Sequence, residues 1–319
     1  MRSVSSAKKR PHGPYGAPLL VALASVLAVG AGGSTSAEPE PVPAVVVERA
    51  GDLYAIAVDG SRTVRLTKTR AYESTPAVSP DGGRIAFGLI DDNGFGLEGD
   101  MGTIRVDGTD RRWLTRGFSD GSPAWAPDGL TVFFVRGRSC GSIYRVSANG
   151  GRARRVTNAL ARPRFPHSHE DPAVAPDGRR IAFSDWNGCE SGYVQPRLRV
   201  VDLNGRPTPD LWRLRRNRYY PDPERSTPAW SPDGKRLVFR KNGDLTIANR
   251  DGSGERRIVS GGGALVYDRP SWSRGEEWIA FTRGESLFIV RPDGTGLRRL
   301  GTARGRRYSV GGWLPTLPK

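Results

Sequence analysis

One short sequence pattern recurs along the chain and constrains its fold more than any other feature. A core of the form Pro-Ala-(Trp or Val)-(Ser or Ala)-Pro-Asp-Gly occupies residues 76–82, 123–129, 172–178 and 228–234. A weaker copy covers 269–281, and the segment 310–315 keeps only the first half. Equivalent positions lie roughly 40 to 56 residues apart, which is the period of four-stranded propeller blades. These positions are Val78, Trp125, Val174, Trp230, Trp272 and Trp313.

Each repeat predicts four short strands joined by tight turns. Pro-Asp-Gly favours a turn because proline presets φ, aspartate bonds to nearby backbone and glycine accepts a positive φ. β-branched and aromatic residues such as Ile85 and Phe87 follow and favour a strand. An Asp-Gly or Asn-Gly pair then predicts a second hairpin. The pairs are Asp59-Gly60, Asp107-Gly108, Asn149-Gly150, Asn204-Gly205, Asp251-Gly252 and Asp293-Gly294.

The repeats close into a ring only if the two ends of the chain share a blade. Residues 45–47 supply the second strand of that blade, and its first strand lies around Trp313. Such pairing removes the open sheet edges that invite aggregation. We therefore predict an all-β fold over residues 44–319, a six-bladed β-propeller of four-stranded antiparallel blades closed by its N- and C-terminal strands.

The repeat cores at 76–82, 123–129, 172–178 and 228–234 resemble the TolB-type, WD-like propeller repeat. The resemblance covers residues 44–317 and implies the propeller architecture. TolB proteins are periplasmic, carry an α/β domain before the propeller and take part in an envelope protein complex. Here only residues 38–44 separate a predicted signal from the first strand, so we expect the propeller without that domain. The resemblance thus implies architecture rather than a place in the Tol complex.

The N-terminus has the pattern of a secretory signal over residues 1–37. Lys8, Lys9 and Arg10 precede an apolar run at 19–30, and small residues end with Ala37 at the expected cleavage site. The run is short for a bilayer span, which favours cleavage over the alternative of an uncleaved membrane anchor. Residues 38–43 would form a short linker. We expect an exported protein that is periplasmic, cell-surface or secreted, with no transmembrane segment after cleavage.

The net charge of +16 favours anionic partners. Export makes nucleic acid a poor candidate, so the expected partner is an envelope or extracellular protein or an anionic polymer. We expect a monomer, and no motif predicts a cofactor.

If the first strand of each blade is innermost, the longest loops, at 89–102, 158–171, 184–197 and 211–226, share one face. Loops on a rigid scaffold commonly carry binding sites. Basic and aromatic residues there predict a channel mouth that binds a protein or an anionic ligand. The alternative is that the aromatic rings pack between blades and the arginines are solvated. The candidates are Arg70, Tyr72, Arg116, Phe118, Arg164, Phe165, Arg218, Tyr219, Tyr267, Arg307 and Tyr308.

Two histidines and two cysteines offer more specific sites. His167 and His169 would lie on one side of an extended segment, so with Glu170 they form a candidate metal site, with Glu190 as the further residue that would complete it. The alternative is a polar loop. Cys140 and Cys189 occupy the same loop position in neighbouring blades, which predicts a disulfide in an exported protein, with two free thiols as the alternative.

Catalytic motifs are weak. Residues 117–121 match G-x-S-x-G, but a strand rather than a helix is predicted to follow, which is unsuited to a nucleophile elbow. We therefore predict a binding or scaffold protein of the cell envelope or extracellular space, more consistent with a non-enzyme. The alternative is an exported hydrolase or lyase that acts on acidic glycans at the channel mouth.

Overall fold

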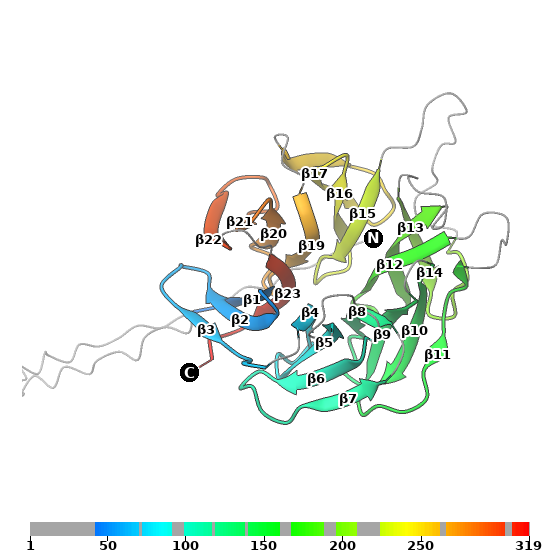
Figure 1. Ribbon diagram of the computed structural model, residues 1–319. Coiled ribbons are helices and arrows are strands. Elements are labelled where there is room, and N and C mark those ends of the chain that lie inside the picture. The colour runs from blue at the N-terminus through cyan, green and yellow to red at the C-terminus, as the bar shows by residue number, and fades with distance from the viewer. Residues whose placement is uncertain are drawn as a thin grey trace, which may run out of the picture. The chain divides into compact units, whose positions relative to one another are not determined.

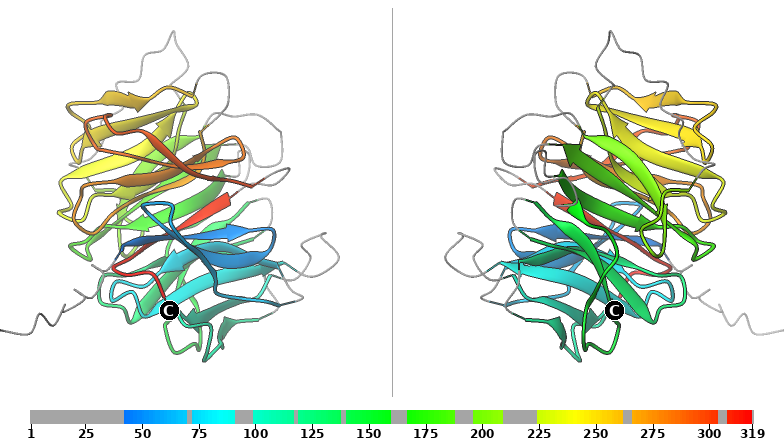
Figure 2. Two further views of the ribbon diagram at one scale, coloured as in Figure 1. Left: turned by 90° about the vertical axis from the view of Figure 1, so that its left-hand side faces the viewer. Right: turned by 90° about the vertical axis from the view of Figure 1, so that its right-hand side faces the viewer.

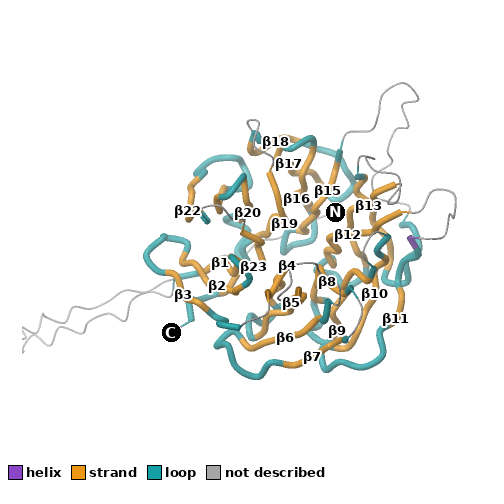
Figure 3. Tube along the Cα trace, viewed as in Figure 1, coloured by secondary structure: helices purple, strands orange, loops and turns teal. Residues whose placement is uncertain are grey.

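The computed structural model describes residues 42–69, 72–90, 99–116, 119–137, 140–159, 167–187, 196–208, 224–261, 266–303 and 308–318. These residues form strands joined by loops (Figure 3). Within these ranges, no helix has the length and apolar character needed to cross a membrane.

The strands form six antiparallel sheets arranged as the blades of a ring (Figure 1). The first strands of neighbouring blades contact one another around the centre. Seen from the side, the strands of each blade run between the two edges of the ring (Figure 2). Five sheets have four strands, and the third has three among the described residues, with a further bridge between Val201 and Pro207. The predicted six-bladed propeller is confirmed.

The blades follow one another along the chain. Blade one comprises β4 (Tyr72–Val78), β5 (Arg84–Ile90), β6 (Met101–Arg105) and β7 (Arg112–Thr115). Blade two comprises β8 (Asp120–Trp125), β9 (Thr131–Arg136), β10 (Ser142–Ser147) and β11 (Arg154–Arg155). Blade three comprises β12 (His167–Val174), β13 (Arg180–Asn187) and β14 (Arg197–Asp202). Blade four comprises β15 (Arg225–Trp230), β16 (Arg236–Lys241), β17 (Asp244–Asn249) and β18 (Arg256–Val259). Blade five comprises β19 (Val266–Trp272), β20 (Ile279–Arg283), β21 (Ser286–Val290) and β22 (Arg298–Thr302).

The sixth blade joins the two ends of the propeller. It is ordered β23 (Tyr308–Leu314), β1 (Ala44–Arg49), β2 (Asp52–Ala57) and β3 (Thr63–Arg65). Val45 of β1 lies opposite Trp313 of β23 on one side and Ile56 of β2 on the other. Both edges of β1 are therefore paired, which confirms the predicted closure of the ring.

The two classes of predicted turn form as their sequences require. In the first Pro-Asp-Gly turn, the N–H of Gly82 donates to the carbonyl of Ser79 at 2.9 Å. In the Asp-Gly turns, the aspartate also fixes the following backbone, as Asp107 Oδ1 does by accepting the N–H of Thr109 at 2.9 Å. Gly108 has φ +81, and a Cβ there would lie 2.6 Å from the Leu66 carbonyl oxygen of the preceding blade. Glycine is thus required both by the backbone and by the neighbouring blade.

Tryptophans on the inner strands tie neighbouring blades together. Each indole Nε1–H donates to a carbonyl on the inner strand of the preceding blade, which satisfies a polar group that would otherwise be buried without a partner. The pairs are Trp125 with Ala77, Trp230 with Ala173, Trp272 with Ala229 and Trp313 with Ser271. Val78 and Val174 occupy the equivalent positions in blades one and three, so the boundaries before those blades lack this bond.

Every inner strand also carries a β-bulge. In blade three the register shifts between Glu170 and Ala173, and Asp171 has φ +51. The equivalent residues Thr75, Ser122 and Thr227 also have positive φ values, of 44°, 54° and 51°. Because a shift of one residue exchanges the two faces of a strand, the bulge decides which side chains face each other at the start of each inner strand.

Candidate functional site

The inner strands begin, and their partner strands end, at the same edge of the ring, which we call the loop edge. In blade one Tyr72 lies opposite Ile90, and in blade three His167 lies opposite Asn187. The predicted long loops attach at this edge, although most of their residues lie outside the described residues. The opposite edge carries the Pro-Asp-Gly and Asp-Gly turns, and we call it the turn edge.

The predicted basic and aromatic residues are only partly described. Tyr308 is 3% exposed and packs in the core with Val310 and Trp313. Tyr72 is exposed, and so is Arg116, whose guanidinium carbon lies 5.8 Å from the centre of the Trp113 ring. Tyr267 lies in β19, and nothing is described of its side chain. The others lie outside the described residues and remain predictions: Arg70, Phe118, Arg164, Phe165, Arg218, Tyr219 and Arg307.

An arginine crosses the centre of the ring. Arg269 of blade five donates from Nε to Asp171 Oδ1 of blade three at 3.1 Å, and from Nη1 to the carbonyl of Pro123 in blade two at 3.2 Å. Blade two lies opposite blade five in a six-membered ring. The guanidinium therefore binds groups of the channel wall itself, a role that the sequence did not predict.

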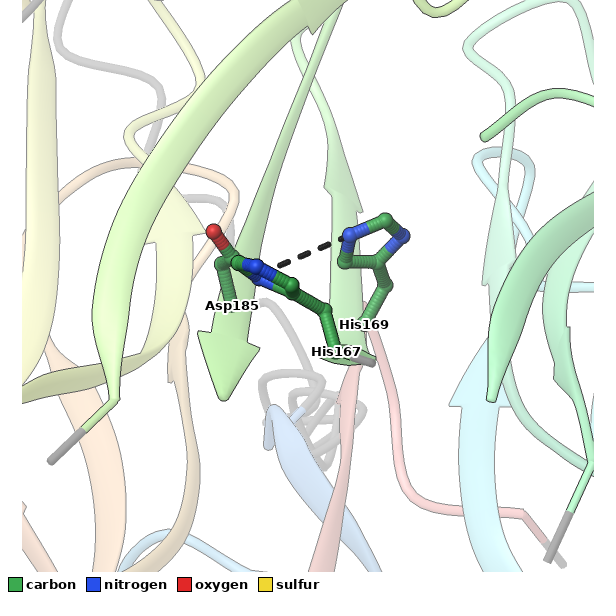
Figure 4. A group of neighbouring side chains, drawn as sticks. All are labelled: His167, His169 and Asp185. Atoms are coloured by element: carbon green, nitrogen blue, oxygen red, sulfur yellow. Dashed lines mark hydrogen bonds and ion pairs between the residues drawn. The ribbon is translucent and has the colours of Figure 1, made fainter. Parts of the chain in front are cut away.

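Blade three brings two histidines and an aspartate together at the loop edge (Figure 4). His167 and His169 are two residues apart in β12, so both rings lie on the same face of the sheet. The bulge places Asp185 of β13 directly opposite His169. Residues that face each other across an antiparallel pair share a sheet face, which explains why all three side chains converge.

The three side chains are close enough to interact directly. His167 Nδ1 lies 2.6 Å from Asp185 Oδ1, and His169 Nε2 lies 3.5 Å from the same oxygen. The side chain of Asp185 is 3% exposed and that of His169 is 8% exposed, whereas His167 reaches 15%. One oxygen of a buried carboxylate thus lies within 3.5 Å of a nitrogen of each imidazole.

Neighbouring residues hold this group in place. Thr157, which follows β11 of blade two, lies 2.8 Å from His169 Nδ1 through its Oγ1 and accepts the N–H of Ile143 at 2.9 Å. Arg199 of β14 pairs through Nε with Asp185 Oδ2 at 2.7 Å. The contacts reach from blade two to blade three, across one of the two boundaries without a tryptophan bond.

Burial controls the protonation of His169. Removal from water disfavours the imidazolium ion and lowers the pKa of His169 to about 4, even though Asp185 acts in the opposite direction. Near neutral pH the ring is therefore neutral, and one of its nitrogens carries a lone pair. A neutral imidazole is the form that binds metal ions.

The cluster opens into a pocket of about 290 Å³ between blades two and three. His167, His169, Arg199 and Phe183 contribute to its wall, together with the backbone around Gly205. The ring of Phe183 meets that of His169 edge to face at a centroid distance of 4.9 Å. The pocket thus combines an apolar wall with a few convergent polar groups, as small-ligand sites do.

The predicted acidic metal ligands and the predicted disulfide are only partly within the described residues. The Glu170 carboxylate accepts a bond from Ser168 Oγ at 3.0 Å, and burial raises its pKa. Asp185 rather than Glu170 lies beside the two imidazoles, and Glu190 lies outside the described residues. Cys189 also lies outside them, so the disulfide with Cys140 remains a prediction.

A second pocket, of about 460 Å³, lies at the turn edge between blades four and five. Arg291 lies over the Trp278 ring at 5.2 Å, and Arg256 and Arg236 line the same space. Glu276 Oε2 accepts a bond from Arg236 Nη2 at 2.6 Å. Basic and aromatic groups thus gather at this edge too, where the sequence pattern of the long loops gave no indication of them.

Comparisons with known proteins agree with the repeat pattern. A TolB homologue from Chlorobium luteolum is 29% identical over 153 residues, which are 48% of this chain and 31% of that protein. The Tol-Pal system protein TolB of Gluconobacter oxydans is 34% identical over 103 residues, 32% of this chain and 22% of that protein. The chain therefore spans less than a third of the length of these two relatives. No family model matches the sequence.

A solved structure extends the likeness over most of the ring. TolB from Acinetobacter baumannii superimposes with a TM-score of 0.63 at 18% identity, covering 85% of this chain and 67% of that one. At that identity the likeness establishes the fold. The predicted resemblance to TolB-type propeller repeats is confirmed.

Proposed function

We propose that this chain, a TolB-like six-bladed β-propeller, is an exported binding or scaffold protein of the cell envelope or the extracellular space. The observation that carries the proposal is the loop edge, where the ends of the predicted long loops attach to the inner strands and to their partner strands. Relatives named as TolB and as a Tol-Pal system protein support an envelope role.

The chemistry of the proposed partner follows from charge. The predicted signal carries four of the sixteen net positive charges, Arg2, Lys8, Lys9 and Arg10, so the exported form keeps 16 − 4 = +12. That charge attracts anionic surfaces over distances of about 10 Å at moderate salt. Arg116, at the end of β7, supplies an exposed guanidinium at the loop edge. We propose that Arg116 acts together with Arg218 and Arg307, two binding residues predicted from the sequence, to bind an acidic protein surface or an anionic polymer.

The experiment compares the two edges of the ring. Full-length protein, purified from cells that express it with its own N-terminus, is tested for binding to immobilised polygalacturonate and to envelope extracts at low and moderate salt. One variant removes loop-edge charge through Arg116→Ala, Arg218→Ala and Arg307→Ala. The matched control removes three exposed arginines from the turn edge through Arg179→Ala, Arg206→Ala and Arg250→Ala.

We expect salt-sensitive binding that the loop-edge variant loses by at least tenfold and the turn-edge control retains. An equal loss of binding in both variants would show that binding depends on net charge alone. It would contradict the proposal that the loop edge is the binding face. Release of new glycan ends in the same assay would instead support the hydrolase or lyase alternative. Capture of one specific protein at all salt concentrations would support the scaffold role without the basic face.

A further inference from the structure

We propose that His167, His169 and Asp185 form a binding site for a divalent transition-metal ion of the zinc class, between blades two and three. Each residue offers one ligand atom, and these atoms all lie within 4.8 Å of one another. The site is separate from the proposed docking of a partner and does not depend on it.

The donor set determines the class of ion. Two imidazole nitrogens and one carboxylate oxygen suit Zn²⁺ and its neighbours Cu²⁺ and Ni²⁺, whereas Mg²⁺ and Ca²⁺ prefer a shell made of oxygens. Three protein ligands leave a fourth coordination position, which would face the pocket of about 290 Å³. The proposed site is thus of the open type, in which water or a ligand from a partner completes the shell.

Two of the three spacings between ligand atoms, those from the imidazoles to Asp185, can be compared with what such an ion requires. With bonds of about 2.0–2.2 Å, ligands in a tetrahedral shell lie roughly 3.3–3.5 Å apart. His169 Nε2 and Asp185 Oδ1 are 3.5 Å apart. His167 Nδ1 and the same oxygen are 2.6 Å apart, a hydrogen-bond distance that has to widen by less than 1 Å. His167 is the first residue of β12 and is the most exposed of the three, so its ring has room to turn.

The surroundings supply the outer shell that metal sites commonly have. A ligating histidine usually donates its second N–H to an oxygen that fixes its tautomer. Thr157 Oγ1 lies 2.8 Å from His169 Nδ1, which leaves Nε2 for the metal ion. Arg199 holds Oδ2 of Asp185 at 2.7 Å and so directs Oδ1 toward the two histidines.

Blade two uses the equivalent positions differently. At the place of His169 and Asp185, blade two has Asp120 and Arg136, which form a two-pronged ion pair at 2.7 Å. That pair is complete in itself. In blade three a carboxylate and two imidazoles take the place of this ion pair. All three groups can donate an electron pair, so a bound cation would complement them.

The experiment measures zinc binding by the full-length protein, purified without a histidine tag and stripped with a chelator. Equilibrium dialysis against buffered Zn²⁺ followed by elemental analysis gives stoichiometry and affinity. Co²⁺ loading gives visible absorption that reports the coordination geometry. The variants are His167→Gln and Asp185→Asn. Glu170→Gln is the matched control, because it changes a neighbouring acid that is not one of the three proposed ligands.

We expect one Zn²⁺ per chain in the wild type and in Glu170→Gln, and at least 100-fold weaker binding in His167→Gln and Asp185→Asn. Thr157→Val removes the outer-shell contact to His169 and also the acceptor of the Ile143 N–H, and it should weaken binding about 10- to 100-fold. No stoichiometric binding by the wild type at micromolar free Zn²⁺ would overturn the proposal, as would unchanged affinity in both ligand variants. If Asp185→Asn fails to fold by circular dichroism, the partly exposed His167→Gln decides the result.

Discussion

Arg269 and Asp171 bind each other across the centre of the ring, from blade five to blade three, with Nε 3.1 Å from Oδ1. Their side chains are 13% and 20% exposed. Asp171 is the bulge residue of its strand, so one residue both sets the register of blade three and receives the bridging guanidinium. The pair therefore meets at the bulge that begins two residues after His169.

Arg269→Met should destabilise the protein by roughly 3 kcal/mol, because it leaves the Asp171 carboxylate largely buried without its cation. Asp171→Asn together with Arg269→Met should cost less than the sum of the two single changes. Urea denaturation of the four proteins measures this coupling. Additive losses would show that the two side chains stabilise the ring independently.

Trp272→Phe tests the bonds between blades. The change keeps an aromatic ring but removes the Nε1–H that donates to the Ala229 carbonyl at 3.2 Å, so the expected loss is roughly 1–3 kcal/mol. Trp278→Phe is the matched control, because its indole packs beneath arginines at the turn edge. Thermal unfolding of both variants should separate them, and an equal shift in midpoint would contradict the proposed importance of the bond.

Acid should weaken the fold through His169. The pKa of this residue is about 4 in the native state, whereas an unfolded histidine titrates near 6.5. Between these values the unfolded chain binds more protons, so the free energy of unfolding falls as pH decreases from about 6.5 to about 4 and then levels off. For metal-free protein the loss approaches roughly 3 kcal/mol.

The contribution of His169 is isolated by subtraction. Glu170, whose pKa is raised by burial, favours the native state at low pH and opposes the effect in part of the same range. His169→Gln keeps Glu170 and the other acids, so the wild type should lose more stability than the variant over this range. Parallel pH profiles for the two proteins would show that His169 titrates alike in both states.

Gly205→Ala and Gly60→Ala form a matched pair for contacts between blades. Both glycines lie in second hairpin turns, with φ +80 and φ +78. A Cβ at Gly205 would lie 2.1 Å from the Val156 carbonyl oxygen of blade two, whereas one at Gly60 would meet nothing within 4 Å. Both changes should cost about 1–2 kcal/mol for the backbone, and Gly205→Ala roughly 1–3 kcal/mol more for overpacking. Chemical denaturation should resolve this difference.

The fold was predictable because its signals are local and repeated. Turn residues such as Asp107 and Gly108 determine the conformation of only a few neighbouring residues. Because the repeat occurs six times in register, the number of repeats gives the number of blades. The closure of the ring followed by elimination, since Val45 and Trp313 each lacked a partner within its own repeat. None of these steps required knowledge of distant contacts.

The candidate site was only half predictable. The pair His167 and His169 follows from strand periodicity, but its acidic partner depends on the bulge. Extending the regular pairing of Ala173 with Ala182 would put Trp186 opposite His169, whereas the bulge puts Asp185 there. A signal was present, because Asp171 occupies the position of Thr75, Ser122 and Thr227, and the same shift recurs in their strands. Arg269 gave no such signal, since its partners lie about 100 or more positions away in sequence.

The pairing of β1 with β23 also has a consequence for how the molecule is made. β1 is synthesised before every blade, yet one of its edges stays open until residues 308–314 have appeared. The sixth blade is therefore the last to be completed, and the contact that completes it spans almost the whole described chain. Contacts this distant slow folding and leave intermediates exposed. Truncation that removes β23 would thus leave one edge of β1 without its partner, and an unpaired strand edge of this kind invites aggregation.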